Sequence, residues 1–381
     1  MSFKGSIYLD SVSSTETSAE IMDTYKLILD KYYANSSSIH KLGVQVSQLE
    51  QKSANQILEL FDVKNYRLIF TSGATEANNI AIKSYAIKNQ HLGRHLITSQ
   101  IEHPSVYESF KFLQDYMGFE VTYLSVNKTG QIDLDELKDS LRADTILVSI
   151  MGVNNEIGTI IDPQEWAKIV KANSKAATHS DMVQALGKID LNFSDIDMAS
   201  FSAHKIAGVN GSGFLLLRDH LELAPLISGG PQQDGLRAGT PNSPANIVLA
   251  KTVRLALENL NLYQKKYHDL NQYLYDKLSL IKQISLNSFQ NVGVYHIINF
   301  SVENVESEIM MNALSNEQIY VSAGSTCLSD VSSESRVLKA IGKDVITQRT
   351  RIRISLDNNI DMQDLERFIK VLKEIIEKYA I

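Results

Sequence analysis

Short apolar segments alternate with longer amphipathic ones through the middle of the chain, and this alternation restricts the fold more than any other feature. The apolar segments are rich in β-branched and aromatic residues, which predicts strands, and each is followed by a turn and a helical pattern. Strands connected by helices of this length form a mostly parallel sheet with helices on both faces, an α/β fold. The predicted strands cover residues 66–70, 95–99, 119–126, 145–151, 176–181, 197–204 and 213–218.

The pattern changes after the last of these strands. One long helix is predicted over 246–281, and short strands and helices then alternate up to a terminal helix at 361–379. Because 381 residues exceed what one hydrophobic core usually organises, two domains are expected. We predict a large α/β domain of residues 14–255 and a small α+β domain formed by residues 1–13 together with residues 256–381.

Composition and charge exclude several classes of protein. The net charge of −7 argues against bulk binding to nucleic acid, because phosphate groups require a basic surface. No apolar run reaches the roughly 18 residues that cross a bilayer, and the first residues do not have the form of a signal peptide. A single cysteine excludes an internal disulfide and a cysteine-rich metal site. We therefore expect a cytoplasmic protein without direct binding to membrane or nucleic acid, and without a metal.

Two polar motifs follow the first two predicted strands. "TSGATEANN" (71–79) opens a helix with a glycine-containing turn, where backbone N–H groups and the helix dipole favour an anion and Thr75 adds a hydroxyl. "EHPSV" (102–106) places His103 between a strand and a helix. An ordinary capping turn and a structural histidine have the same appearance, so neither motif identifies a site by itself.

Three further motifs follow later strands. "VNNEIGT" (153–159) has the composition of a turn. Asp181 ends a strand, and Gln184 lies about one helical turn further on. Without a second carboxylate or a histidine cluster, Asp181 suits a protonated ring nitrogen better than a metal. Lys205 lies in a glycine-rich connection, where a partly desolvated lysine can form a Schiff base, although most single lysines are solvated surface residues.

The order of these motifs is more specific than any one of them. An anion site, an aromatic ring, an acid for a ring nitrogen and a glycine-flanked lysine follow successive strands of one sheet. Pyridoxal 5'-phosphate requires this set: a phosphate cradle, a stacking ring, a counter-ion for its pyridine nitrogen and a lysine for its aldehyde. The sequence therefore predicts a pyridoxal-phosphate site.

The chain closely resembles the NifS/IscS-like cysteine desulfurases of the class-V aminotransferase family, which are fold-type I pyridoxal-phosphate-dependent transferases. The resemblance covers nearly the whole chain. The motifs that carry it, in chain order, are "YLD" (8–10), "SSIHKLG" (37–43), "FTSGATEANN" (70–79), "EHPSV", "VNNEIGTI", "HSDMVQALGKI", "SAHKIAG", "GLRAGTPN" (235–242), "SAGSTC" (322–327) and "RIRISL" (351–356).

The resemblance implies a role for each motif. Lys205 binds the cofactor covalently, while His103 stacks on its ring and moves protons. Asp181 pairs with the ring nitrogen, and Gln184 hydrogen-bonds the phenolic oxygen. The phosphate group is implied to lie among Gly73, Ala74, Thr75, Ser202 and His204.

The resemblance also implies the substrate site and the oligomer. Asn154, at the edge of the cofactor, and Arg353 would bind the carboxylate of the substrate, a task that suits an arginine fork. Thr240 matches a threonine that such enzymes donate across a dimer interface, so a homodimer with shared active sites is implied.

The only cysteine, Cys327, lies in "SAGSTCLSD" (322–330) among small, turn-forming residues. The residues alone fit an incidental exposed thiol as well as a reactive one. The resemblance implies that the Cys327 thiolate takes the sulfur of L-cysteine as a persulfide while L-alanine leaves. The persulfide sulfur would then pass to an acceptor protein of iron–sulfur cluster assembly, tRNA thiolation or another thio-cofactor pathway.

Some segments depart from the family pattern, namely residues 11–14, Ser36, residues 209–210 and residues 231–233. None of these departures removes a group that binds the cofactor or takes part in the reaction. They leave two alternatives open. One is a different pyridoxal-phosphate reaction on the same scaffold, such as that of a selenocysteine lyase or an aminotransferase, and the other is a weakly catalytic paralogue that recruits partners.

Overall fold

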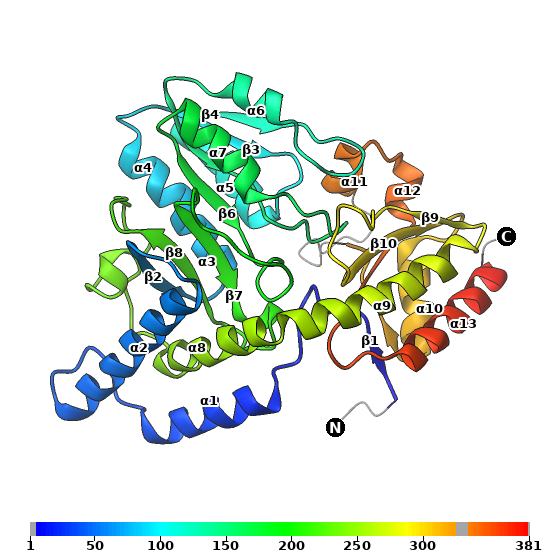
Figure 1. Ribbon diagram of the computed structural model, residues 1–381, viewed down its shortest axis with the longest axis horizontal. Helices are drawn as coiled ribbons and strands as arrows, with labels where there is room; N and C mark the ends of the chain where they lie inside the picture. The colour runs from blue at the N-terminus through cyan, green and yellow to red at the C-terminus, as the bar shows by residue number, and fades with distance from the viewer. Residues whose placement is uncertain (1–4, 325–333, 380–381) are drawn as a thin grey trace.

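The computed structural model of the chain describes residues 5–324 and 334–379, and a seven-stranded sheet lies at the centre of its larger part (Figure 1). The strand order is β2-β8-β7-β6-β5-β3-β4, and only β8 runs antiparallel to its neighbours. The mostly parallel α/β sheet expected from the sequence is thus confirmed. The strands are β2 (Tyr66–Thr71), β3 (His95–Ser99), β4 (Glu120–Leu124), β5 (Thr145–Ser149), β6 (Ala177–Asp181), β7 (Met198–Ser202) and β8 (Gly213–Arg218).

Helices cover both faces of this sheet because successive strand residues point to opposite sides. Leu68 and Phe70 belong to the core on one face, whereas Ile69 between them belongs to the core on the other. The first face is covered by α2 (Lys41–Leu60), α6 (Leu134–Ser140), α7 (Pro163–Asn173) and α8 (Ser243–Glu258), with α1 (Ala19–Lys31) packed outside α8. The second is covered by α3 (Ala74–Asn79), the π-helical turn η1 (Ile80–Ser84), α4 (Tyr85–Asn89) and α5 (Pro104–Met117).

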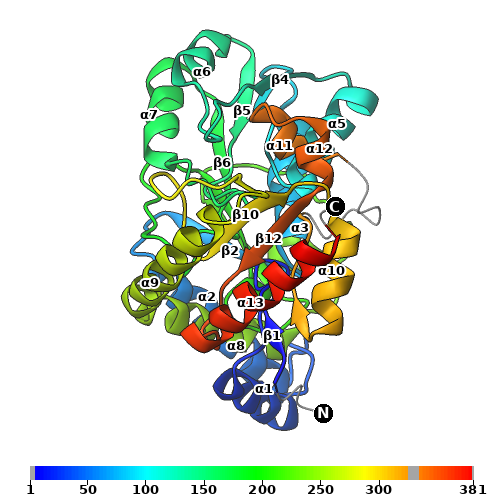
Figure 2. The same ribbon diagram turned by 90° about the vertical axis from the view of Figure 1, so that its right-hand side faces the viewer.

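The remaining elements form a second, smaller unit with its own apolar core (Figure 2). An antiparallel sheet of order β12-β10-β9 lies beside a two-stranded parallel pair, β1 and β11, which joins the two halves of the sequence. The strands are β1 (Ile7–Tyr8), β9 (Ile284–Leu286), β10 (Ile297–Val302), β11 (Ile319–Tyr320) and β12 (Arg351–Ser355). The helices are α9 (Leu260–Ser279), α10 (Ser307–Asn316), α11 (Arg336–Ala340), α12 (Val345–Arg349) and α13 (Met362–Tyr379).

The single long helix predicted over 246–281 is wrong, because α8 and α9 are separate helices that meet at Asn259. The Asn259 side chain donates to the Leu255 carbonyl at 2.8 Å, and its backbone N–H donates to the same oxygen at 3.2 Å. An asparagine that binds the backbone in this way competes with the helical ladder. We infer that the boundary between the two domains lies at this break, close to the predicted boundary after residue 255.

Two short 3-10 turns, η2 (Ala203–Lys205) and η3 (Gln233–Gly235), lie in the connections that follow β7 and β8. Within the described part of the chain, no helix combines the length and the apolar character needed to span a membrane.

Candidate functional site

A cavity of about 290 Å³ lies where the parallel strands of the large sheet end. The loops after β2, β3, β5, β6 and β7 each contribute to its wall, and a single arginine of β12 enters from the smaller unit. Carboxyl ends of parallel strands meet at one edge, so residues distant in sequence come together there. Most of the predicted site residues line this cavity, namely Gly73, Ala74, Thr75, His103, Asp181, Gln184, Ser202, His204, Lys205 and Arg353.

One end of the cavity is built for an anion. Gly73 precedes α3 with φ of 150°, a conformation that disfavours other residues, and a Cβ there would lie 3.5 Å from Ser202 Oγ. The first N–H groups of a helix have no acceptor within the helix, so those of Ala74 and Thr75 suit an anionic group. Ser202 Oγ lies 2.8 Å from Nδ1 of His204 and closes the other side of this end.

His204 is a neutral member of this wall at ordinary pH. Burial, helped by the charge of Lys205, lowers its pKa to about 4. A neutral imidazole acts on a phosphate as a hydrogen-bonding group and not as a charge, so the helix N-terminus would supply most of the favourable field at this end.

The acid and the histidine of the predicted ring site face the same cavity. Asp181 is buried, and its carboxylate accepts from the Val183 N–H at 3.1 Å and from Asn78 Nδ2 at 2.8 Å. Asn78 also donates to Ser105 Oγ at 2.8 Å, which in turn lies 2.8 Å from Nδ1 of His103. Sequence reasoning missed Asn78 and Ser105, although both lie inside the quoted motifs.

Lys205 ends the 3-10 turn after β7 and reaches the segment that leads from β1 into the large unit. Its ammonium donates to the backbone oxygens of Val12 and Ser13, at 2.6 Å each. Gln184 contacts the same segment, since its Nε2 donates to Val12 O at 3.3 Å. The lysine, the acid, the histidine and the anion end thus surround one cavity, and this donor set fits pyridoxal 5'-phosphate.

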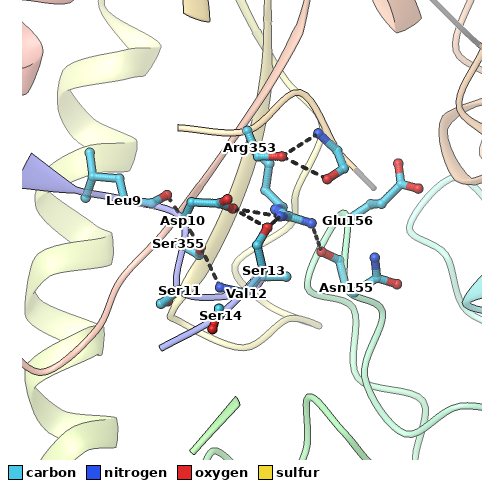
Figure 3. A network of polar contacts seen from close by, with 12 residues as sticks. Leu9, Asp10, Ser11, Val12, Ser13, Ser14, Asn155, Glu156, Arg353 and Ser355 are labelled. Atoms are coloured by element: carbon cyan, nitrogen blue, oxygen red, sulfur yellow. Dashed lines mark hydrogen bonds and ion pairs between the residues drawn. The ribbon is translucent and has the colours of Figure 1, made fainter. Parts of the chain in front are cut away.

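Arg353 lines another part of the cavity wall, and Figure 3 shows its guanidinium among Asp10, Ser13 and Asn155. Its guanidinium donates to Asn155 O at 3.0 Å, to Asp10 Oδ1 at 2.8 Å and to Ser13 Oγ at 2.9 Å. The side chain is only 1% exposed, and its Nε has no partner among the described residues. Asp10 and Ser13 were missed from the sequence. A "YLD" motif followed by a serine gives no signal that it meets an arginine more than three hundred residues away.

Two predicted residues lie apart from the cavity wall, and a third falls outside the described residues. Asn154 is buried inside its own loop, where Nδ2 donates to Ile101 O at 2.9 Å and Oδ1 accepts from two backbone N–H groups. The neighbouring Asn155 lines the cavity instead. Thr240 is exposed and lines a second cavity of about 180 Å³, and Cys327 lies outside the described residues.

The residues that flank the undescribed segment 325–333 attach to the walls of the cavity. Ser322 and Arg353 exchange backbone hydrogen bonds at 3.1 and 2.6 Å. On the other side, Ser335 Oγ donates to Glu156 Oε2 at 2.6 Å, and Arg336 donates to the carbonyl of Glu102 at 3.3 Å. The described residues on both sides of segment 325–333 are therefore attached to Arg353 or to residues next to the cavity lining.

Comparisons with known proteins agree with this geometry. The family model described as "Aminotransferase class-V" matches residues 7–368. The chain is 38% identical over 378 residues to a protein named "Cysteine desulfurase IscS" from Dictyoglomus turgidum, covering 98% of this chain and 95% of the relative.

Two solved structures share the fold. One, described as "NIFS-LIKE PROTEIN", has a TM-score of 0.91 at 31% identity over 98% of this chain and 99% of its own. The other, described as "SspA in complex with cysteine", has a TM-score of 0.80 at 30% identity over 92% of this chain and 98% of its own. The chain belongs to the class-V aminotransferase family and, within it, to the pyridoxal-phosphate-dependent NifS/IscS-like cysteine desulfurases.

Proposed function

We propose that this protein is a cysteine desulfurase that converts L-cysteine to L-alanine and leaves the sulfur as a persulfide on Cys327. The observation that carries the proposal is the single cavity that Lys205, Asp181, His103 and Arg353 share. The relative named as a cysteine desulfurase and the neighbour described in complex with cysteine support the substrate.

Each wall of the cavity then has a task. Bound pyridoxal phosphate supplies an electron-withdrawing ring next to the amino-bearing carbon of the substrate. Lys205 would hold its aldehyde carbon, Asp181 would keep the pyridine nitrogen protonated, and Gln184 would donate to the phenolic oxygen. His103 would stack on the ring and hold a proton at its edge.

The sulfur step belongs to Cys327. Its thiolate attacks the sulfur of L-cysteine, a sulfur–sulfur bond forms as the carbon–sulfur bond breaks, and a proton replaces sulfur on the β-carbon so that alanine is released. Arg353 would orient the carboxylate of the substrate. Three acceptors already bind its Nη1 and Nη2 groups, and Nε has no partner among the described residues. The persulfide would pass to an acceptor protein of a thio-cofactor pathway, and a cytoplasmic location stays a prediction.

A homodimer is part of this proposal. Large apolar side chains are exposed on α1, on the loop that follows it and at the start of α2: Met22, Leu27, Leu29, Tyr33, Ile39, Leu42 and Val44. Exposed apolar side chains gathered on neighbouring elements suit a protein contact. Exposed Thr240, which does not line the cofactor cavity of its own chain, would serve the cavity of the second copy.

The sulfur chemistry is tested with Cys327→Ser. The wild-type protein should produce alanine and, with a reductant, sulfide from L-cysteine, whereas the variant should bind the cofactor and release no sulfide. Full sulfide release by the variant would contradict the persulfide step. Selenocysteine cleavage by the variant would favour the lyase alternative, and a yellow protein without alanine production would favour the weakly catalytic paralogue.

The shared active sites are tested by mixing two inactive variants, Lys205→Ala and Thr240→Ala. If Thr240 acts across a dimer interface, one site of each mixed dimer is intact, and about a quarter of the wild-type activity should return. If Thr240 serves its own chain, mixing restores nothing.

A further inference from the structure

Two side chains outside the predicted site join His103 to Asp181. Asn78 of α3 is fully buried and donates from Nδ2 to Asp181 Oδ2 and to Ser105 Oγ, at 2.8 Å each. The Ser105 oxygen lies 2.8 Å from Nδ1 of His103. One continuous chain of hydrogen bonds therefore runs from the imidazole to the carboxylate.

The directions of these bonds follow from the chemistry of the groups. An ionised carboxylate can only accept, so the amide of Asn78 must turn its nitrogen toward Asp181. The same nitrogen donates its second hydrogen to Ser105, and the hydroxyl hydrogen of Ser105 is left for His103. Asn78 Oδ1 has no partner among the described residues, as expected for an amide that its two donors orient.

A second donor fixes Nδ1 of His103 as an acceptor. His103 is the N-cap of α5, and the backbone N–H of Ser105 donates to Nδ1 at 3.2 Å. A backbone N–H cannot reverse its direction. In a neutral imidazole the accepting nitrogen carries no proton, so the proton of His103 lies on Nε2. A second proton would have to enter at Nδ1, against both donors.

The charges around His103 also favour the neutral ring. Burial is the largest influence and lowers its pKa, and the cations Lys205, Arg336 and Arg353 lower it further. The charge of Asp181 raises the pKa of His103, but the net shift of this pKa is still downward. A lowered pKa favours the neutral ring, which carries one proton, and the hydrogen bonds decide which nitrogen carries it.

We propose that Asn78 and Ser105 are positioning residues that hold His103 as the neutral Nε2–H tautomer and connect it to Asp181. The only proton of the ring then lies on the nitrogen that does not cap α5, so any proton exchange by His103 takes place there. The catalytic meaning of this arrangement rests on the role proposed above for His103, whereas the tautomer itself does not.

Nitrogen NMR of the holoenzyme labelled with ¹⁵N-histidine tests the tautomer, with His103→Gln used to identify the signals of this ring. We expect an unprotonated Nδ1 and a protonated Nε2 from roughly pH 6 to 8. In Ser105→Ala the backbone donor remains but the hydroxyl and the link to Asn78 are lost. The share of rings protonated on Nδ1 should rise about fivefold, which corresponds to one ordinary hydrogen bond. The acidic limb of the kcat profile should move to higher pH.

Ser109→Ala is the matched control, because it removes another α5 hydroxyl that donates to Ser105 O at 2.7 Å and makes no hydrogen bond to His103. Its nitrogen signals should equal those of the wild type. A wild-type ring protonated on Nδ1, or a Ser105→Ala variant that matches Ser109→Ala, would overturn the proposal. The signals are read without turnover, so failure to desulfurate cysteine would contradict the proposed function and not the tautomer.

Discussion

The two ends of the cavity are built in different ways. At the cofactor end, most wall residues come from loops after neighbouring strands of one sheet, and Val12 and Ser13 of the N-terminal segment accept from Lys205. At the substrate end, Arg353 of β12 is held by Asp10 and Ser13 from the first residues and by the backbone of Asn155 from the large sheet. One end is built mostly from loops of a single sheet, and the other exists only when three distant segments meet.

We therefore expect a substitution at the substrate end to leave the geometry of the cofactor end unchanged. The cofactor end should keep its shape when the substrate end is altered, because no side chain that surrounds the ring depends on Arg353 for a hydrogen bond among the described residues. A substitution at the cofactor end is more able to affect the substrate end, because Ser13 accepts from Arg353 with its hydroxyl and from Lys205 with its carbonyl. Segment 10–15 links the two ends through these contacts.

The largest effect is expected from Asp181→Asn. A neutral amide keeps the shape of the side chain but loses the negative charge opposite the ring nitrogen, and kcat should fall about 10³-fold. Alanine production is the measurement, and the visible absorption of the cofactor checks that it is still bound. Asp190→Asn, an exposed acid of the same connection, should behave as the wild type. A wild-type rate for Asp181→Asn would remove the acid from the mechanism.

Arg353→Ala should be next in size and should separate the two ends. The loss of the guanidinium removes the fork for the substrate carboxylate, so kcat/KM for L-cysteine should fall about 10²-fold while the cofactor spectrum stays unchanged. Arg353→Lys should recover little, because one ammonium cannot reproduce three separately directed bonds. Equal loss of cofactor binding in both variants would mean that the ends are not independent.

Asp10→Asn should have a smaller effect with opposite signs on binding and on stability. The amide oxygen can still accept from Arg353, but the buried guanidinium loses its counter-charge. The free energy of unfolding should therefore fall, whereas KM for L-cysteine should decrease about threefold, because the substrate carboxylate no longer competes with a like charge. Chemical denaturation and steady-state kinetics measure the two effects. An increase in KM would show that Asp10 orients Arg353 more than it competes with the substrate.

A separate effect, on the pH dependence of stability, concerns Glu102, which precedes His103 in the sequence and whose carbonyl oxygen accepts from Arg336. Burial raises the pKa of Glu102 to about 8, although Ser99 and the Met151 N–H donate to its Oε1. The folded state thus holds a proton that the unfolded state releases above its ordinary pKa of 4.5. Stability is full below this value and is lost as pH rises toward 8, by something on the order of 4 kcal/mol.

Glu102→Gln should flatten this dependence. The variant should melt at a higher temperature than the wild type at about pH 8.5 and show no such advantage at about pH 5, because its amide has no proton to lose. Thermal unfolding monitored by circular dichroism is the measurement. The exposed Glu108→Gln on α5 serves as control, and an unchanged pH slope in Glu102→Gln would assign that slope to another group.

The sequence predicts the cofactor end of the cavity better than the substrate end, and the reason is physical. Strand periodicity locates the loops that carry His103, Asp181 and Lys205, and the topology of a parallel sheet then brings them together. No local pattern states that Asp10 meets Arg353, because that contact depends on how two units pack. Family resemblance supplied Arg353 itself, but its partners became visible only in the structure.

The sequence also does not predict which side chains of a loop line the cavity. Asn154 and Asn155 are adjacent and chemically identical. The side chain of Asn154 makes hydrogen bonds that hold its own loop, whereas Asn155 lines the cavity. The break between α8 and α9 at Asn259 was also not predictable from local sequence. An asparagine can occupy a helix, but here its side-chain amide donates to a backbone carbonyl and competes with the helical hydrogen bonds. These outcomes depend on tertiary contacts that periodicity does not contain.

The segment between β1 and α1 has a consequence for how the protein is made. It is synthesised long before its partners, since β1 pairs with β11 near residue 320, and the Val12 N–H donates to Ser355 Oγ at 3.0 Å. Until those residues are synthesised, the acceptors of Lys205 and the counter-charge of Arg353 have no fixed place. Contacts of such long sequence separation form slowly. A nascent chain can therefore complete the large sheet early and assemble this part of the site only after residues 319–355 have been synthesised.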